Sequence, residues 1–320
     1  MDGRNSVIAI FACRRPKLLK DLIVSLQANR EAKESDLIIF VGGARNKRDS
    51  QLVLDTIKVA KSVTGFKTVQ VQKCLKILGA GDLISYGIEK ALKERDRLIV
   101  LEDDLVVRKD FLLYMNTALE RYKDDPKVSQ VSGWNFGIMK NGNPEKTYLL
   151  QNTTSWGWGT WRRAWLYPTD VRSDFKILTE SYHRIRKFNY GDNYNLLPLL
   201  ERVIESNFDA YDVQFSLYNH IRGMLTLYPN SSLIINQGFN DGSNFKNKHW
   251  KSEFEERPVS QFSFPKKTVV SMHQEKYNRL VRRWVLTFWP TSKLRFSFAK
   301  QKRKFLYFKK YGSWRFFLTR

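Results

Sequence analysis

The sequence predicts an α/β fold in which helices cover a largely parallel sheet. Short apolar segments rich in β-branched residues alternate with amphipathic segments of helical period over residues 7–101. Strands and helices that alternate in this way form parallel sheets. Right-handed crossovers then bring the carboxyl ends of the strands to one rim, where ligands of such sheets bind. Three acidic residues follow the fourth apolar segment, so this rim is the expected place for a site.

The first part of the chain contains four expected strands with three helices between them. We expect the strands at residues 7–11, 36–41, 68–71 and 97–101. We expect the helices at residues 16–28, 51–63 and 82–93. In the first helix, Leu18, Leu22 and Leu26 recur on one face with Leu19 and Ile23 beside them, which is the spacing of a helix that packs on a sheet.

The rhythm changes after residue 125 or so. We expect a helix at 110–122, a strand at 128–131, a helix at 196–204, and a hairpin that pairs 224–228 with 233–236. The segment 211–221 carries Asp212. The second part is therefore a less regular continuation of the first.

Composition places the chain among globular proteins of a reducing compartment. A length of 320 residues with 42% hydrophobic residues allows a sizeable core. Cys13 and Cys74 are too few for a disulfide framework. The first apolar run is too short for a signal peptide, and no run reaches the roughly 18 apolar residues of a membrane span. We therefore expect a cytoplasmic protein.

Glu102, Asp103 and Asp104 follow the apolar run 98–101 directly. Three carboxylates at the end of a buried strand repel one another unless a cation lies among them. Hard divalent cations are held by one or two carboxylates and completed by phosphate oxygens. The triplet therefore predicts a site for a metal and a phosphorylated substrate, and a solvated acidic loop is the alternative interpretation.

The segment 155–161 contains Trp156, Trp158 and Trp161, separated by glycines and small residues. Glycines allow close backbone approach, and indole rings offer stacking faces with one hydrogen-bond donor each. This pattern favours the wall of a sugar-binding site over the interior of a strand, with core packing as the alternative.

These motifs resemble those of the N-acetylglucosaminyltransferase I-like family of inverting, nucleotide-sugar-dependent glycosyltransferases. The resemblance covers roughly residues 6–245. It is strongest in the run from Val100 to Val107 with its acidic triplet, in Asp110-Phe111 and Asp125-Pro126, and in the segment 131–135. The Trp-Gly segment and Ala210-Tyr211-Asp212 look like those of bacterial members that assemble polysaccharides.

The resemblance implies a GT-A fold and one catalytic domain over residues 1–275. Residues 1–125 would form its nucleotide-sugar-binding half, and residues 126–275 its acceptor-binding half. The implied reaction transfers N-acetylglucosamine or a similar hexose from a UDP-sugar to a hydroxyl group. The implied acceptor is a bacterial glycan or lipid-linked molecule in lipopolysaccharide, capsule or exopolysaccharide assembly.

The donor-site residues follow from the same resemblance. Asp104 matches the ligand of Mn²⁺ (or Mg²⁺), while Glu102 and Asp103 match contacts of the nucleotide-sugar. In the exit of the first strand, Ala12 and Cys13 match residues near the base, and Arg15 matches one near the diphosphate. A guanidinium also suits that place chemically, because it pairs with phosphate oxygens bidentately.

On the acceptor side, Asp212 resembles the catalytic base, which an aromatic residue precedes in the family. The expected acceptor contacts are Trp156, Gly157, Trp158 and Tyr211. From the residues alone, Asp212 is equally an ordinary helix-cap aspartate, and Asp209 is its nearest rival as a base.

The sequence departs from the family in two places. Relatives usually carry an acidic residue at the end of the second strand, where Gly42 stands here, so selectivity for the nucleotide is open. Asn244 stands where bacterial relatives often carry a histidine. The four histidines of the chain show no metal-ligand spacing.

The last 45 residues, 276–320, contain 14 Lys or Arg, no Asp or Glu, and 13 aromatic residues. Apolar side chains at 277–289 follow a helical period with arginines on the other side. A cationic helix with an aromatic face suits an anionic membrane, which predicts a peripheral protein on the inner face of the cell membrane. A helix packed on the catalytic domain and a nucleic-acid-binding tail are the alternatives, and we expect no nucleic acid because the acidic motif would then be unexplained.

Two other functions fit parts of the pattern. A nucleotidyltransferase that acts on a sugar phosphate also uses strand-end carboxylates, a metal and a nucleotide. A non-catalytic basic protein that binds membranes or nucleic acid would explain the net charge of +23.

Overall fold

The structure is a computed structural model that describes residues 5–74, 78–135, 147–165, 170–206, 208, 210–229, 231–238, 269–271, 278–279, 281–282 and 293–312. Its strands are β1 (Val7–Ala12), β2 (Asp36–Val41), β3 (Thr68–Lys73), β4 (Arg97–Glu102), β5 (Leu105–Val107), β6 (Val128–Ser132), β7 (Thr147–Leu150), β8 (Trp158–Trp161), β9 (Leu225–Pro229), β10 (Ile234–Asn236) and β11 (Val269–Ser271). Its helices are α1 (Pro16–Gln27), α2 (Lys47–Lys61), α3 (Ala80–Glu94), α4 (Phe111–Arg121), α5 (Val171–Thr179), α6 (Tyr182–Phe188), α7 (Leu197–Ser206), α8 (Tyr211–Ile221) and α10 (Lys293–Tyr311), with a 3-10 turn at Arg30–Glu34.

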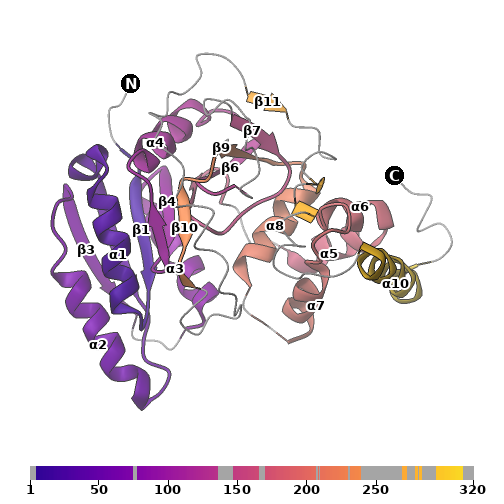
Figure 1. Ribbon diagram of the computed structural model, residues 1–320, viewed down its shortest axis with the longest axis horizontal. Coiled ribbons are helices and arrows are strands. Elements are labelled where there is room, and N and C mark those ends of the chain that lie inside the picture. Colours follow the sequence, from indigo (N-terminus) through magenta and orange to yellow (C-terminus); the bar gives the residue numbers. More distant parts are fainter. Residues whose placement is uncertain are drawn as a thin grey trace.

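One large sheet runs through the described part of the chain, in the order β11-β7-β9-β6-β8-β4-β1-β2-β3. Its pairings are parallel except at β4–β8, β6–β8 and β7–β9. A separate two-stranded sheet joins β5 to β10. The expected α/β class with a mostly parallel, helix-covered sheet is therefore confirmed (Figure 1).

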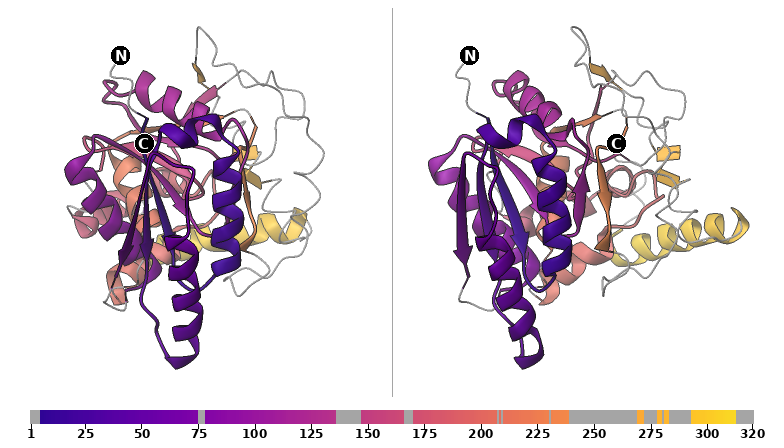
Figure 2. Two further views of the ribbon diagram at one scale, coloured as in Figure 1. Left: turned by 90° about the vertical axis from the view of Figure 1, so that its left-hand side faces the viewer. Right: turned by 60° about the vertical axis from the view of Figure 1, so that its left-hand side comes forward.

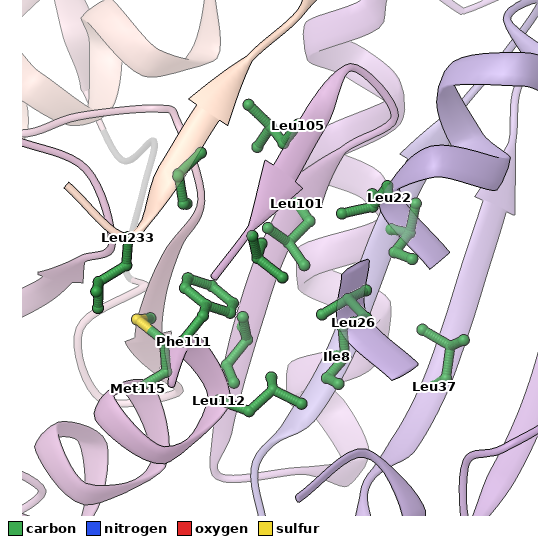
Figure 3. Close-up of a cluster of buried hydrophobic side chains, with 14 of the residues drawn as sticks. Ile8, Leu22, Leu26, Leu37, Leu101, Leu105, Phe111, Leu112, Met115 and Leu233 are labelled. Atoms are coloured by element: carbon green, nitrogen blue, oxygen red, sulfur yellow. The ribbon is translucent and has the colours of Figure 1, made fainter. Parts of the chain in front are cut away.

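Both faces of the sheet are covered around β1 and β4. In β1, Ile8 and Ile10 belong to a core cluster shared with α1, α2 and α4, whereas Val7 and Phe11 belong to a cluster shared with α3 and α8. Figure 3 shows the first cluster, in which side chains of α1 and α4 meet those of the strands. A strand buried on both faces reads as a continuous apolar run, which is why β1 and β4 were recognisable in the sequence.

A third core lies among α5, α6, α7 and α8 and includes Val281 and Tyr307 near the C-terminus. These helices lie together on the side of the sheet away from β3, and α10 lies beyond them (Figures 1 and 2). Of the amphipathic helix expected at 277–289, most residues lie outside the described part of the chain. Within the described residues, no helix is both long enough and apolar enough to cross a membrane.

Two sequence-based expectations for the second half are wrong. The strands β9 and β10 do not pair as a hairpin, because β9 lies between β6 and β7 while β10 pairs with β5. The Trp-Gly segment contains a strand, β8, which inserts antiparallel between β4 and β6. Pairing between strands far apart in sequence decided both outcomes, and local patterns do not carry that information.

Candidate active site

The carboxyl ends of β1, β2 and β4 meet at one rim, as the alternating pattern predicted. The backbone N–H of Asp103 donates to the carbonyl oxygen of Phe11 at 3.0 Å, and the N–H of Gly42 donates to that of Ala12 at 2.9 Å. Residues from three separate strand ends are thereby fixed within hydrogen-bond reach of one another. This rim positions the acidic triplet, the exit of β1 and the end of β2.

Arg15 is the cation that lies among the acids. Its Nη1 donates to Oδ2 of Asp104 at 2.9 Å, and its Nη2 forms an ion pair with Asp103. The whole residues Asp103 and Asp104 are only 1% and 9% exposed. The alternative of a solvated acidic loop is therefore wrong, because both carboxylates are buried and paired.

Burial and neighbouring charges shift the pKa values of the residues in this cluster. Burial raises the pKa of Asp103 to about 6, against the lowering effect of Arg15. Burial also raises the pKa of Glu102, and the charges of Asp104, Asp212 and Asp103 raise it further. For Arg15, burial lowers the pKa, but the charges of Asp103 and Asp104 outweigh burial and leave the pKa raised. Burial and neighbouring charges thus favour the protonated forms of Glu102 and Asp103, and a bound cation would favour their ionised forms.

Asp212 joins this cluster from a distant part of the chain. It lies in the first turn of α8, and its charge contributes to the raised pKa of Glu102 at the end of β4. The N-cap of α8 is Ala210, so the interpretation of Asp212 as the helix cap is wrong. Its rival Asp209 lies outside the described residues. The fold thus brings together the two acidic motifs that the sequence singled out separately.

A cavity of about 180 Å³ opens beside the acids. It is lined by the expected residues Ala12, Cys13, Arg15, Gly42, Glu102 and Asp103. Arg14 and Arg45 line it as well, so three arginines and three acids, Asp49, Glu102 and Asp103, border this space. Such a cavity suits an anionic ligand with an apolar or aromatic part, because Leu78, Leu83 and Ile84 complete its wall.

Gly42 leaves this cavity without the acidic side chain that the family carries there. A Cβ at this position would lie 3.2 Å from Cδ2 of Leu83, which is tight. Asp49 of α2 lines the same cavity and is held by Nη1 of Arg14 at 3.2 Å. The sequence analysis did not single out Asp49. Its local signal was the spacing of three residues from Asn46, which caps α2 by accepting from the N–H of Asp49 at 3.0 Å.

The residues expected to contact the acceptor differ in how deeply they are buried. Trp156 is half-buried and packs edge-on against Trp134, with ring centroids 4.7 Å apart. Trp158 is fully buried in β8 and stacks on Phe215, so its ring offers no exposed face. Tyr211 is 6% exposed and belongs to the same core cluster. Trp158 is therefore part of the core, and the expectation that it contacts the acceptor is wrong.

Gly157 has a structural role that the sequence hinted at. Its φ of +55° lies in the left-handed region, and a Cβ there would lie 1.8 Å from Cδ1 of Ile234. Its carbonyl oxygen accepts from the N–H of Gly133 at 2.7 Å. Close backbone approach is thus real at this glycine, and it packs β8 against the small sheet.

The carboxylates fit a hard divalent cation that also takes ligands from a substrate. Asp103 and Asp104 supply oxygen ligands. A Cβ at Gly238 would lie 2.2 Å from Oδ2 of Asp104, so a side chain at this position would displace that carboxylate. Within the described residues, no three His, Cys, Asp or Glu side chains are arranged to hold a metal by themselves. A cation here would need phosphate oxygens to complete its coordination, as Mg²⁺ does in nucleotide sites.

The chain is similar to several proteins of known structure. No family model and no curated protein matches the chain. The chain is similar to S. aureus TarS 1–349, with 10% identity, a TM-score of 0.39, and coverage of 70% of this chain and 60% of that one. This chain thus spans less than two thirds of that structure.

Two further solved structures are similar at the same level. The galactosyltransferase LgtC, solved with donor and acceptor sugar analogues, has 12% identity, a TM-score of 0.36, and coverage of 69% of this chain and 73% of that one. Glucosyl-3-phosphoglycerate synthase from Mycobacterium tuberculosis, solved with Mg²⁺ and UDP, has 12% identity, a TM-score of 0.30, and coverage of 50% and 57%. The family resemblance of the motifs therefore stays a prediction, and the case for function rests on the site.

Proposed function

We propose that this chain is a metal-dependent, inverting glycosyltransferase that moves a sugar from a UDP-sugar to a hydroxyl group. One observation carries the proposal: Asp103 and Asp104 converge on Arg15 at the strand-end rim beside Glu102, and the charge of Asp212 in α8 raises the pKa of Glu102. The cavity beside them has guanidinium groups for a diphosphate and apolar walls for a base. The motif resemblance supplies the sugar-transfer chemistry.

In this proposal Asp104, with Asp103 beside it, would hold the divalent cation. A bound Mn²⁺ or Mg²⁺ would supply Lewis-acid stabilisation of the charge on the leaving diphosphate. Arg15 would turn from Asp104 to the phosphate oxygens, for which its planar, five-donor guanidinium is suited. Gly42 and Cys13 would border the base.

Asp212 would act as the general base toward the acceptor. Its carboxylate takes the proton of the acceptor hydroxyl while that oxygen bonds to the anomeric carbon. The bond from the anomeric carbon to the phosphate oxygen breaks on the opposite face, UDP leaves, and the configuration inverts in one displacement. The chain needs no nucleophile of its own for this reaction.

The finer assignment is N-acetylglucosamine or a similar hexose as the donor sugar and a bacterial glycan or lipid-linked molecule as the acceptor. The motif resemblance supports this class, in lipopolysaccharide, capsule or exopolysaccharide assembly. A screen of UDP-sugars with a bacterial lipid and glycan extract, read as release of UDP, tests it. Release of pyrophosphate from a nucleoside triphosphate and a sugar phosphate would instead support a nucleotidyltransferase.

Thermal unfolding with UDP and Mn²⁺ tests the site itself. We expect UDP to raise the melting temperature only when Mn²⁺ is present, and Asp104→Ala to abolish this effect. Asp96→Ala is the matched control, because this exposed acid precedes β4 at the opposite end of the strand. If Asp104→Ala is stabilised as strongly as the unaltered protein, Asp104 does not hold the cation.

We also propose that the C-terminal region places the enzyme on an anionic membrane at its inner face. In α10, Phe305 and Leu306 are 65% and 48% exposed, and Lys302 and Lys309 lie one turn to either side of them. Apolar side chains flanked by lysines suit a bilayer that contains acidic lipids. Phe305→Ser with Leu306→Ser should weaken binding to vesicles of phosphatidylglycerol and phosphatidylcholine, and unchanged binding would refute this part.

A further inference from the structure

The connection between α6 and α7 has a rare backbone conformation. Tyr190, Gly191 and Asp192 have φ values of 55°, 68° and 65°. In this left-handed region the Cβ crowds the backbone, so residues other than glycine adopt it singly and seldom in succession. Such a conformation persists only where its surroundings hold it, and it is found most often at functional sites. We call residues 190–192 the left-handed turn.

Side chains of the C-terminal helix α10 bind the backbone carbonyl groups of the left-handed turn. Nζ of Lys300 donates to the carbonyl oxygen of Gly191 at 3.2 Å and to Oδ1 of Asn193 at 2.7 Å. Nη2 of Arg303 donates to the carbonyl oxygen of Asp192 at 2.9 Å. These bonds would be lost if the turn relaxed, because its carbonyl groups would then point elsewhere.

The same helix is anchored on both sides of the turn. Tyr307 is 8% exposed, and its hydroxyl donates to Oδ1 of Asn195 at 2.6 Å. One turn farther on, Nζ of Lys310 pairs with Oε1 of Glu201 in α7 at 3.1 Å. The helix α10 also contacts α6, which precedes the turn (Figure 1). It therefore spans the connection and fixes its two ends.

The left-handed turn carries Tyr190, whose ring packs against that of Tyr194. The rings of Tyr190 and Tyr194 meet edge-on, with centroids 6.2 Å apart. Burial raises the pKa of each tyrosine, and the charge of Asp212 contributes to both shifts. The hydroxyl of Tyr190 donates to the carbonyl oxygen of Thr153 at 3.4 Å, in the segment that leads to Trp156. Tyr190 thus joins the left-handed turn to the segment that leads to the expected acceptor side.

Holding the turn in this way places a lysine partly away from bulk water. Lys300 is half-buried, and burial lowers its pKa to about 8. An apolar side chain would avoid that desolvation cost but could donate to neither oxygen acceptor. The neighbouring Lys302 and Lys309 are exposed on the other side of the helix. They provide matched positions of the same residue type.

We propose that α10 acts as an intramolecular clamp, in which Lys300 and Arg303 fix the left-handed turn and so position Tyr190 against Thr153 and Tyr194 against Tyr190. Lys300 and Arg303 are positioning residues, since they act through the left-handed turn and do not line the cavity for the nucleotide. The clamp itself follows from the contacts alone. Its effect on the reaction rests on the proposed glycosyltransferase function and concerns the acceptor, because the donor cavity is lined by residues 11–103.

Hydrogen–deuterium exchange tests the clamp without any substrate. In Lys300→Ala with Arg303→Ala, amides of residues 189–195 should exchange at least tenfold faster than in the unaltered protein. Lys302→Ala with Lys309→Ala should leave these amides unchanged. Lys300→Arg should restore slow exchange in part, since a guanidinium also donates to two acceptors. If the double variant does not fold, Lys300→Ala alone provides the same comparison.

Kinetics then test the positioning role. With a UDP-sugar and a glycan extract from bacteria, the clamp variants should need at least a tenfold higher acceptor concentration for half-maximal UDP release. Their affinity for UDP with Mn²⁺ should stay within twofold of that of the unaltered protein. A purely structural role would lower stability without separating the acceptor from the donor.

Each result has a distinct meaning. Unchanged exchange at 189–195 in the clamp variants would overturn the clamp. Faster exchange with an unchanged acceptor requirement would overturn the positioning role. If the unaltered protein neither binds UDP with Mn²⁺ nor releases it from any UDP-sugar, the proposed function fails, while the exchange experiment still decides the clamp.

Discussion

The two ends of the large sheet are built on different principles. At one end, β1, β2, β3 and β4 pair in parallel, with helices between them in the chain and apolar packing on both faces of β1 and β4. At the other end, β8 enters antiparallel between β4 and β6, and β9 reaches β6 from almost 100 residues away. The first end gathers an anionic rim and a cavity with guanidinium groups. The second end leads to α8, from which the charge of Asp212 acts on Glu102 at that rim. In the proposed function, the regular region binds the nucleotide and the irregular region acts on the acceptor.

This contrast suggests that changes in the two regions separate binding from transfer. Residues of the regular end should alter the binding of the cation and the nucleotide. Residues of the irregular end should alter transfer to the acceptor, or the stability of the inserted strand, with little effect on the nucleotide. Three changes test this division, in decreasing order of expected effect.

Asp212→Asn should have the largest effect. Loss of a general base lowers a rate by about 100- to 10,000-fold, because the acceptor hydroxyl then attacks with its proton still attached. Binding of UDP with Mn²⁺, followed by calorimetry, should stay nearly the same. If Asp212→Asn transfers sugar at the normal rate, Asp212 is not the general base. The variant Asp209→Asn would then show whether Asp209 is the base instead.

Gly157→Ala should destabilise the irregular end next most strongly. An alanine forced into the left-handed region costs about 1–2 kcal/mol of unfolding free energy. Overlap of its Cβ with Ile234 adds about 1–3 kcal/mol, because β8 packs tightly there.

Gly223→Ala provides the control for that prediction. Its φ is +65°, but nothing lies within 4 Å of the Cβ that would be added. Only the conformational cost should appear in its urea unfolding curve. Equal losses in both variants would mean that packing at Gly157 contributes nothing.

The smallest predicted effect is a pH dependence at the regular end. The pKa of Asp103 is raised to about 6 in the folded protein. A carboxyl group with a raised pKa stabilises the fold at low pH, and this contribution disappears as the pH rises through about 6. Binding of a cation has the opposite dependence, because it needs the ionised carboxylate and must displace the proton.

Affinity for UDP with Mn²⁺ should therefore fall below pH 6 or so, by up to about tenfold per unit for each proton displaced. Calorimetry at pH 5, 6 and 7 measures this fall, and Asp103→Asn should reduce the slope. An affinity that does not vary over this range would show that the acids of the rim do not bind the cation.

The sequence alone predicted the regular end almost completely. The expected first strand and helix, 7–11 and 16–28, became β1 and α1 with shifts of one residue, because an apolar period and a proline at the helix start are local signals. The acidic triplet was placed at the rim for the same reason, since the direction of parallel strands follows from their order in the chain. These features depend on neighbours a few residues away.

Only the tertiary structure determined the rest. Trp158 looked like a binding wall and is core, since long-range pairing inserts β8 between two other strands. The helix α10 has a cationic sequence that points to a surface partner, and its packing on the left-handed turn was invisible until both were placed. Charges show their partners only after folding brings them together: Asp104 meets Arg15 across 89 residues, and the charge of Asp212 in α8 acts on Glu102 at the end of β4.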